Sequence, residues 1–329
     1  MRVSARPEAS TEPEAAAIEL ASPEPLLSAR AVRSLASWAL VVVQVGLLLA
    51  MTATVATKIW QDHYWFGWGL CALTAVAWLP ELGKARARRW WFVYVAGIFF
   101  YTLLRAYAGK TAIPIQTSYV IDFDHLVFRG GDPTAWLQER LFSVSRVSVL
   151  DIVTVQVHWS FFIAPHLMAV IIFVRRRDLF PRYAALMVGI MYAGLLVFFL
   201  VPTTPPWLAA RTGYLSEAYR VMDFVGGRVS ADTYRTFAAP LAEPNAVAAM
   251  PSIHMAVTFA MYLWARDNGY RKLAPWLLAY TVVMGVSLVY LAEHYVLDLL
   301  AGIACAVAVH AVSRRLVKPQ NFGSPAEER

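Results

Sequence analysis

Residues 274–313 read APWLLAYTVVMGVSLVYLAEHYVLDLLAGIACAVAVHAVS, and this segment indicates the architecture of the whole chain. Its two apolar runs are each close to the ~20 residues that a helix needs to cross a bilayer. Only a short string with Glu293, His294 and Asp298 separates them. Ionisable groups at membrane depth are costly, so this string marks a candidate functional site. Because residues four apart lie on one face of a helix, we expect Asp298 to hold one ring nitrogen of His294 while the other points outward.

Apolar runs of similar length recur along the chain, of which 59% is hydrophobic. They fall at 35–57, 64–82, 90–108, 151–174, 182–201 and 252–266, before the two runs at 274–292 and 294–313. This pattern predicts an all-α fold, a polytopic bundle of eight transmembrane helices. Residues 1–34, rich in Ala, Glu, Pro and Ser, are predicted to form a disordered tail.

Basic residues alternate between the predicted spans. Clusters follow the second, fourth, sixth and eighth runs, as in Arg175, Arg176 and Arg177. By the positive-inside rule these clusters are cytoplasmic, so we expect a multi-pass protein of the cell membrane with both termini in the cytoplasm. The long connections 109–150 and 202–251 then lie outside. The net charge of +7 is distributed between spans rather than along one solvated face, which disfavours a nucleic-acid partner.

This topology brings several polar groups to one membrane face. His254 opens the sixth run and His294 opens the eighth, while a TTPPW string at 203–207 closes the fifth. Arg105 lies near the outer end of the third run. The spans were assigned from apolar length and basic loops alone, so this convergence is independent support for an extracytoplasmic site.

The external connections carry local signals of their own. Asp132 followed by Pro133 is typical of a helix start, and we expect a helix in the outer interface there. Trp207 is predicted to join the aromatic belt of the membrane. His158 and His166, eight apart on the fourth run, would lie on nearly one helix face. Their expected role is interhelical packing, with lining of a cavity as the alternative.

Three potential metal ligands lie close together in the first external connection. Asp122, Asp124 and His125 could hold a cation, but their spacing fits no metal-binding template. We therefore expect neither a metal nor any other cofactor.

The motifs on the last three runs resemble those of the type 2 phosphatidic acid phosphatase superfamily, P-S-x-H and S-R-x5-H-x3-D. The matching residues, in order, are Pro251, Ser252, His254, Ser287, His294 and Asp298, followed by Gly302. The resemblance covers about 100–302. Leu288 stands where phosphatase members carry a phosphate-binding arginine, and no K-x6-R-P string occurs. The Pro-Pro-Trp string at 205–207 is instead similar to the inositol phosphorylceramide synthase branch, whose members transfer a phosphoryl head group.

The resemblance implies a six-helix core and a histidine mechanism. His294, oriented by Asp298, would attack phosphorus and form a phosphohistidine, and His254 would protonate the leaving oxygen. Ser252 and the backbone amides at the start of the sixth run would hold phosphate oxygens.

A guanidinium is also expected at the phosphate, because bidentate pairing matches phosphate geometry. Leu288 cannot supply it. Arg105 is the first candidate, with Arg211 and Lys110 next.

The predicted protein is thus a membrane phosphotransferase with a catalytic membrane domain at 90–314, two accessory spans within 35–89 and a cytoplasmic tail at 315–329. Its donor would be a phospholipid or polyprenyl phosphate, and its acceptor a lipid, a polyol or water. Membrane lipids surround it. With water as the acceptor it would be a lipid phosphate or pyrophosphate phosphatase. A non-catalytic scaffold or transporter is the third hypothesis, but the sequence does not show the broken helices and paired repeats of a transporter.

Overall fold

The computed structural model describes residues 86–233 and 245–319, with a few positions between 39 and 47. The predicted tail 1–34 and the predicted span 64–82 lie outside these residues, as does nearly all of the predicted span 35–57. The described residues form helices and isolated β-bridges but no strand. The long helices are α4 (Arg86–Arg105), α7 (Val149–Ser160), α8 (Ala164–Arg175), α9 (Phe180–Leu200), α13 (Ile253–Asp267), α14 (Ala274–Tyr290) and α15 (Val296–Leu316). The shorter ones are η1 (Ala108–Lys110), α5 (Ser118–Val127), α6 (Pro133–Leu141), η2 (Arg177–Leu179), α10 (Pro206–Arg211) and α11 (Val221–Thr233).

The apolar helices make this a multi-pass membrane protein, but eight spans are not confirmed. Among the described residues three helical segments, Arg89–Lys110, Arg177–Leu200 and Val296–Leu316, are long and apolar enough to cross a membrane. A fourth span exists if α7 and α8 together form one. The predicted runs at 252–266 and 274–292 form α13 and α14, of 15 and 17 residues. At ~1.5 Å per residue both are shorter than the ~30 Å hydrocarbon core.

The predicted helix at 151–174 is broken in its middle. α7 and α8 meet at an angle of 43°. Pro165 occupies the first turn of α8, and a proline cannot continue a helix that enters from its N-terminal side without losing a backbone hydrogen bond. The carbonyl of Pro165 accepts a hydrogen bond from the Tyr183 hydroxyl at 2.8 Å, which fixes the break against α9.

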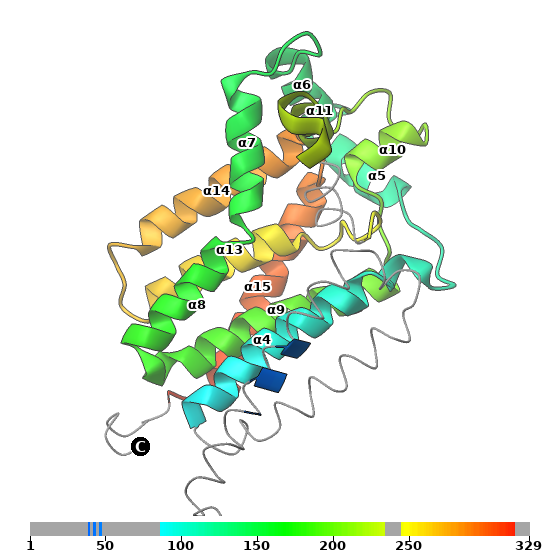
Figure 1. Ribbon diagram of the computed structural model, residues 1–329. Helices are drawn as coiled ribbons and strands as arrows, with labels where there is room; N and C mark the ends of the chain where they lie inside the picture. The colour runs from blue at the N-terminus through cyan, green and yellow to red at the C-terminus, as the bar shows by residue number, and fades with distance from the viewer. Residues whose placement is uncertain (1–38, 40–41, 44–45, 48–85, 234–244, 320–329) are drawn as a thin grey trace, which may run out of the picture.

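α9 packs against α4, α13 and α15 (Figure 1). Phe180, Tyr183 and Ile190 on α9 are completely buried, as are Ala256 and Ala260 on α13. α13 also packs against α14 and α15. The three C-terminal helices are therefore held together around α13, and α9 joins them to α4.

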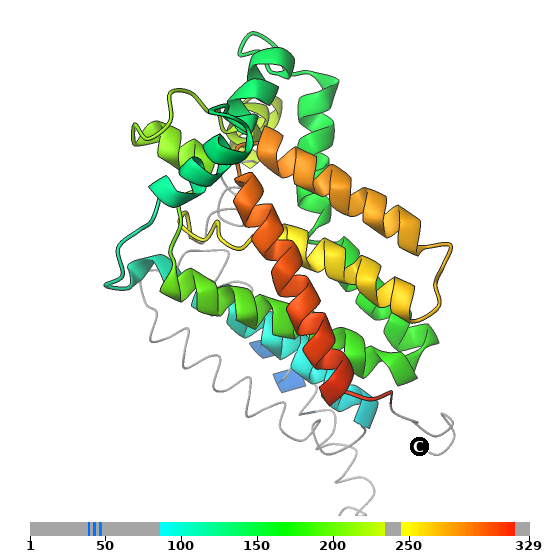
Figure 2. The same ribbon diagram turned by 180° about the vertical axis from the view of Figure 1, so that it is seen from behind.

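The short helices α5, α6, α10 and α11 gather at one end of the bundle (Figures 1 and 2). There α6 contacts α14, and α5 contacts α15. The connections at this end are tied together through Thr203, whose N–H donates to the carbonyl of Val247 at 2.8 Å. The neighbouring carbonyl of Pro202 accepts from the N–H of Gln116 at 2.8 Å. The predicted helix start at Asp132 is confirmed, since its carboxylate accepts hydrogen bonds from the N–H groups of Thr134 and Ala135.

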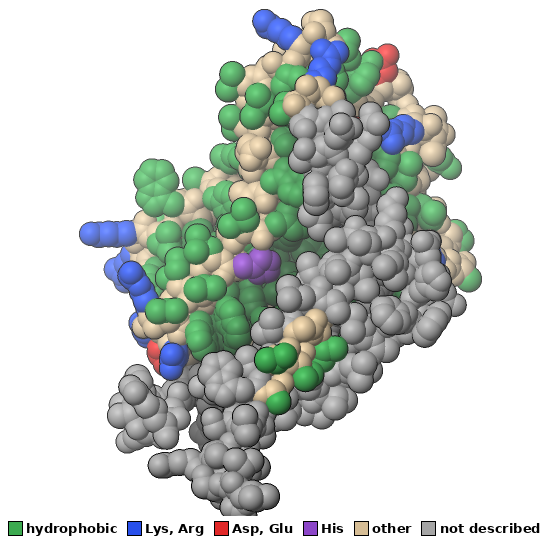
Figure 3. Space-filling model, in the orientation of Figure 1, with side chains coloured by type: hydrophobic (Ala, Val, Ile, Leu, Met, Phe, Trp, Pro, Cys, Tyr) green, Lys and Arg blue, Asp and Glu red, His purple; other side chains and the backbone are tan. Residues whose placement is uncertain are grey.

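The surface supports a membrane setting. Large apolar side chains such as Val174, Leu196, Trp276 and Val282 are exposed along the bundle. In Figure 3 hydrophobic side chains dominate the face between the ends of the bundle, whereas basic side chains gather toward those ends. Such an apolar belt would be a liability in water and is expected where lipid surrounds the helices.

Gly302 allows α15 to approach the start of α13 closely. A Cβ at this position would stand 2.5 Å from the carbonyl oxygen of Ser252 and 3.2 Å from the Cβ of Met255. Any side chain at 302 would therefore push apart the two helices that carry the polar motifs.

We expect the substitution Gly302→Ala to destabilise the protein despite the better helix propensity of alanine. Overpacking costs typically 1–3 kcal/mol, against a gain of about 1 kcal/mol for replacing glycine in a helix. The measurement is the thermal unfolding midpoint in detergent. Gly227→Ala on α11 is the matched control, because a Cβ there meets nothing within 4 Å. Equal midpoints for the two variants would contradict the close approach.

Candidate active site

His254 lies in the first turn of α13, at the end of the bundle that the short helices cover. Ser252 caps this helix, since its Oγ accepts a hydrogen bond from the N–H of Met255 at 3.3 Å. The N–H of Ser252 donates to the carbonyl of Asp298 at 3.0 Å, which fixes the start of α13 against α15. Both ring nitrogens of His254 are buried and lack a hydrogen-bond partner among the described residues. The ring can therefore bind a group that enters from the adjoining cavity.

His294 follows the C-terminal end of α14, which closes in a Schellman motif. Ala292 adopts a left-handed conformation with φ 61°, and the N–H of Glu293 donates to the carbonyl of Leu288 at 3.0 Å. The N–H of Ala292 donates to the carbonyl of Val289 at 3.1 Å. This reversal directs Glu293 and His294 toward the start of α13.

The predicted contact between His294 and Asp298 is present, although His294 precedes α15 rather than lying on it. The two residues are buried, and His294 Nδ1 is 3.3 Å from Asp298 Oδ2. The same oxygen accepts a hydrogen bond from the N–H of Tyr295 at 2.9 Å, so Asp298 caps the helix as well. This carboxylate favours the tautomer in which Nδ1 carries the proton, which leaves Nε2 with its lone pair.

Three imidazole rings meet at this point. The rings of His254 and His294 have centroids 5.6 Å apart, and those of His254 and His158 are 4.7 Å apart. His158 comes from the C-terminal half of α7, just before the break at Pro165, and is buried. Both histidines pack between helices and also line a cavity, the small one described below for His158 and the larger one for His166. His166 Nδ1 is in addition 2.8 Å from the Tyr94 hydroxyl of α4.

Two cavities meet at the histidines. A small one of about 40 Å³ is lined by the three histidines together with Arg105, Trp207, Arg220 and Glu293. A larger one of about 210 Å³ lies beside it and shares His254, His294 and Arg105. The remaining walls of the larger cavity are mostly apolar side chains of α4, α9 and the link between α7 and α8, such as Tyr101, Met191 and Phe161. A polar chamber thus adjoins an apolar one, an arrangement that suits a polar head group on a hydrophobic chain.

The predicted phosphate-binding cations differ in their placement. Arg105 lines both cavities, and its buried Nε lacks a hydrogen-bond partner among the described residues. The Arg211 side chain is 58% exposed and lies over the Trp207 ring, outside both cavity linings. Lys110 is exposed and lies over the ring of Tyr107. Of the predicted cations, the geometry favours Arg105 for a ligand in the cavity.

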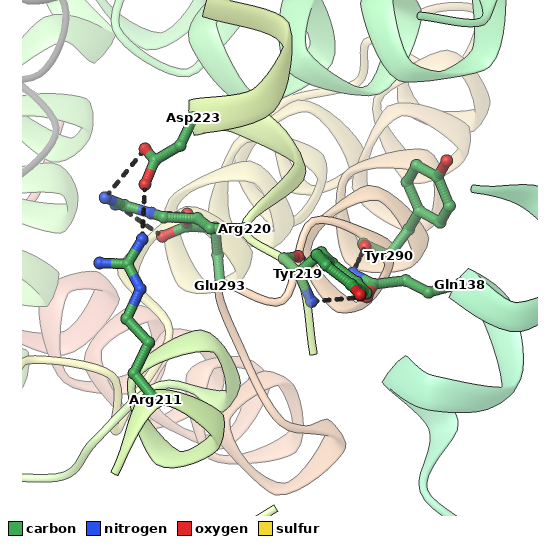
Figure 4. Close-up of polar contacts among 7 residues, drawn as sticks. All are labelled: Gln138, Arg211, Tyr219, Arg220, Asp223, Tyr290 and Glu293. Atoms are coloured by element: carbon green, nitrogen blue, oxygen red, sulfur yellow. Dashed lines mark hydrogen bonds and ion pairs between the residues drawn. The ribbon is translucent and has the colours of Figure 1, made fainter. Parts of the chain in front are cut away.

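Arg220 is a cavity residue that sequence reasoning missed. Its Nε donates to Glu293 Oε1 at 2.7 Å, and its Nη1 lies 3.4 Å from Asp223 Oδ1 (Figure 4). The guanidinium also lies over the indole of Trp207, with its carbon 4.4 Å from the ring centroid. Trp207 is buried and does not belong to an exposed aromatic belt, so that expectation was wrong.

Two further residues singled out in the sequence, Leu288 and Asp124, lie outside both cavity linings. Leu288 is completely buried in an apolar cluster with Met255, Met284 and Leu299, so this position does not face a phosphate site. Asp124 accepts a hydrogen bond from the N–H of Val296 at 3.1 Å, and burial raises its pKa to about 6. Among the described residues no group of three His, Cys, Asp or Glu side chains could hold a metal ion.

Comparison with known proteins identifies one family. A family model described as the PAP2 superfamily matches residues 118–312, more than half of the chain. Searches of curated proteins and of solved structures returned no match. The matched segment contains the three histidines, Asp298 and the Arg220 pair with Glu293.

Proposed function

This chain belongs to the PAP2 superfamily, and from that premise we propose that it transfers a phosphoryl or phospho-alcohol group between lipids through a phosphohistidine on His294. The observation that carries the proposal is the pairing of His294 with Asp298 opposite His254, in a chamber that Arg105 also lines. The inositol phosphorylceramide synthase branch, indicated by the Pro-Pro-Trp string at 205–207, is part of the same proposal.

In the first step His294 Nε2 attacks the phosphorus of the donor lipid. A bond forms between this nitrogen and phosphorus while the bond from phosphorus to the leaving oxygen breaks. His254, in its protonated form, gives its proton to that oxygen, and the donor leaves as an alcohol. Asp298 stabilises the charge that develops on the ring of His294, as the buried aspartate does in hydrolytic triads.

In the second step the acceptor hydroxyl attacks the phosphohistidine. His254, now neutral, accepts the hydroxyl proton, and the bond from phosphorus to Nε2 breaks, so that both histidines regain their starting forms. Arg105 compensates the negative charge of the phosphoryl oxygens in both steps. Backbone amides at the start of α13 assist it. Ser252 caps α13 through its Oγ and lines neither cavity. Its role as a phosphate ligand therefore stays a prediction.

We propose further that the site faces the extracytoplasmic side of the cell membrane and that both termini are cytoplasmic. The site lies at the N-terminal ends of α13 and α15, whereas Arg266, Arg271, Arg314 and Arg315 lie at or beyond the opposite ends of these helices. This separation supports the orientation under the positive-inside rule. The catalytic membrane domain is proposed at 90–314, with accessory spans within 35–89.

The function is tested by following a ³²P-labelled phospholipid donor with the purified protein in proteoliposomes. We expect slow release of water-soluble phosphate alone, and diversion of the label into a new product when a polyol or hydroxylated lipid is added. His294 is buried, and Trp207 of α10 and Arg220 before α11 line the small cavity with it, which would limit access of water. Unlabelled inositol supplied only outside sealed spheroplasts should divert the label equally well if the site is extracytoplasmic.

Two results would overturn parts of this proposal. Fast hydrolysis that no acceptor diverts would favour a lipid phosphate phosphatase over a transferase. Diversion by inositol only after the spheroplasts are opened would place the site on the cytoplasmic side.

A further inference from the structure

We infer that the ion pair of Arg220 and Glu293 is the subsite for a polyhydroxylated alcohol group, carried either by the free acceptor or by the head group of the donor. The inference rests on the proposed transfer reaction and adds a specificity-determining element to it. No part of the histidine mechanism above uses either side chain.

The pair lies in the chamber where the reaction would occur. Arg220 and Glu293 both line the small cavity together with His254 and His294. Glu293 directly precedes His294 in the chain, and after the left-handed turn at Ala292 both residues line the small cavity. A group bound to phosphorus at His294 would therefore lie next to this pair.

The charge of the pair argues against phosphate as its ligand. Glu293 approaches Arg220 through both carboxylate oxygens, with Nε to Oε1 at 2.7 Å and Nη2 to Oε2 at 3.4 Å. The two charges neutralise each other, and an exposed edge of the carboxylate would repel the oxygens of a phosphoryl group. Arg105 has no ion pair of this kind among the described residues and remains the cation for phosphate.

A hydroxyl group fits such a pair, because it both donates and accepts hydrogen bonds. The carboxylate of Glu293 would accept from one hydroxyl, and the guanidinium of Arg220 would donate to its neighbour. An alcohol with adjacent hydroxyls can use both contacts at once, which an aliphatic alcohol cannot. The chamber is thus divided into a phosphate side at Arg105 and a hydroxyl side at Arg220 and Glu293.

The surroundings hold the pair rigidly, as a recognition element requires. Gln138 on α6 is buried, and its side chain donates to the carbonyls of Tyr219 at 2.8 Å and Tyr290 at 2.7 Å (Figure 4). Its amide oxygen accepts from the N–H of Tyr219 at 2.8 Å. Gln138 therefore clamps the segment that carries Arg220 to the end of the helix that precedes Glu293.

Glu293→Gln is the decisive variant, since it keeps the shape of the side chain and removes its charge. With ³²P-labelled dioctanoyl phosphatidic acid as donor and inositol as acceptor, we expect the inositol concentration for half-maximal diversion to rise roughly 10- to 100-fold, the loss typical of a hydrogen bond to a charged group. Turnover without inositol is measured in parallel, and it should fall by a smaller factor than the inositol dependence. Glu293→Asp should restore part of the inositol dependence, because it keeps the carboxylate.

A second donor distinguishes the two sources of the hydroxyl group. If the subsite holds the donor head group, Glu293→Gln should raise KM for dioctanoyl phosphatidylinositol by a similar factor and leave KM for phosphatidic acid unchanged. This comparison works even if the wild-type protein only hydrolyses its donors. Failure of the transfer proposal is therefore seen in the wild type, and failure of the present inference is seen in the variant.

Controls separate recognition from a merely structural ion pair. Glu139→Gln on α6 removes the charge of an exposed carboxylate and should change nothing. Asp223→Asn removes the other carboxylate near Arg220 without altering the cavity lining, and should leave the inositol dependence within about twofold of wild type. Thermal unfolding in detergent verifies folding, and Arg220→Lys provides a second test if Glu293→Gln does not fold.

Two outcomes would overturn the inference. One is an equal loss of turnover with both donors and without inositol, which would mean that Glu293 only supports the fold or the chemistry. The other is an unchanged inositol dependence and an unchanged KM for phosphatidylinositol in a folded Glu293→Gln or Arg220→Lys protein.

Discussion

Replacing His294 with alanine is expected to abolish turnover of a labelled phospholipid donor. Without the imidazole no bond to phosphorus can form, and in a hydrolytic triad the loss of the nucleophile costs roughly six orders of magnitude in rate. Rapid acid-free quenching of the wild-type protein should trap a phosphorylated species that is labile in acid and stable in base, as phosphohistidine is. The His294→Ala protein should trap none.

A matched control lies near the far end of α15, the helix that follows His294. His310 Nε2 pairs with Asp267 at 2.9 Å, so the bundle contains a second, partly buried contact between a histidine and an aspartate, outside both cavities that His294 lines. His310→Gln should leave turnover within a few-fold of wild type. A folded His294→Ala protein that turns over or is phosphorylated like the wild type would rule out His294 as the nucleophile.

The second large effect is expected for Asp298→Asn, with a loss of roughly four orders of magnitude in kcat, by analogy with the aspartate of hydrolytic triads. The amide would still accept the hydrogen bond from the N–H of Tyr295 through its oxygen, so the cap of α15 is retained. What changes is the tautomer and the charge stabilisation of His294. KM should therefore change little while kcat falls.

Asp267→Asn is the corresponding control, because it alters the carboxylate of the remote pair with His310. We expect a kcat within a few-fold of wild type for that variant. A drop in kcat of less than about tenfold for a folded Asp298→Asn protein would show that the aspartate acts mainly as a helix cap.

Several parts of the fold could be predicted from local sequence. Apolar length predicted α4, α9 and α15, and Asp132 with Pro133 predicted the start of α6. These features depend on neighbouring residues and on the length of chain that fits a bilayer. Pro165 is a local indication of the break between α7 and α8. A prediction of spans from hydropathy alone does not use it.

Other parts of the site depend on contacts between distant segments. Arg220 and Glu293 are 73 residues apart, and no periodic pattern links them. Their pairing requires the segment before α11 to fold back over the end of α14. Gln138, on α6, holds these two segments together through hydrogen bonds to both. For His158 the sequence predicted packing between helices, with lining of a cavity as the alternative. The break that follows it and the contact of its ring with His254 depend on tertiary structure.

Asp298 serves as a common reference point for both histidine-bearing segments. Its side chain contacts the ring of His294, and its backbone carbonyl accepts the hydrogen bond that anchors Ser252, two residues before His254. A tilt of the bundle in a thicker or thinner bilayer would therefore carry the two imidazoles along together. As long as these two contacts persist, the distance between the two imidazole rings does not depend on the thickness of the bilayer. The reacting groups therefore keep their relative positions while the outer helices change their tilt.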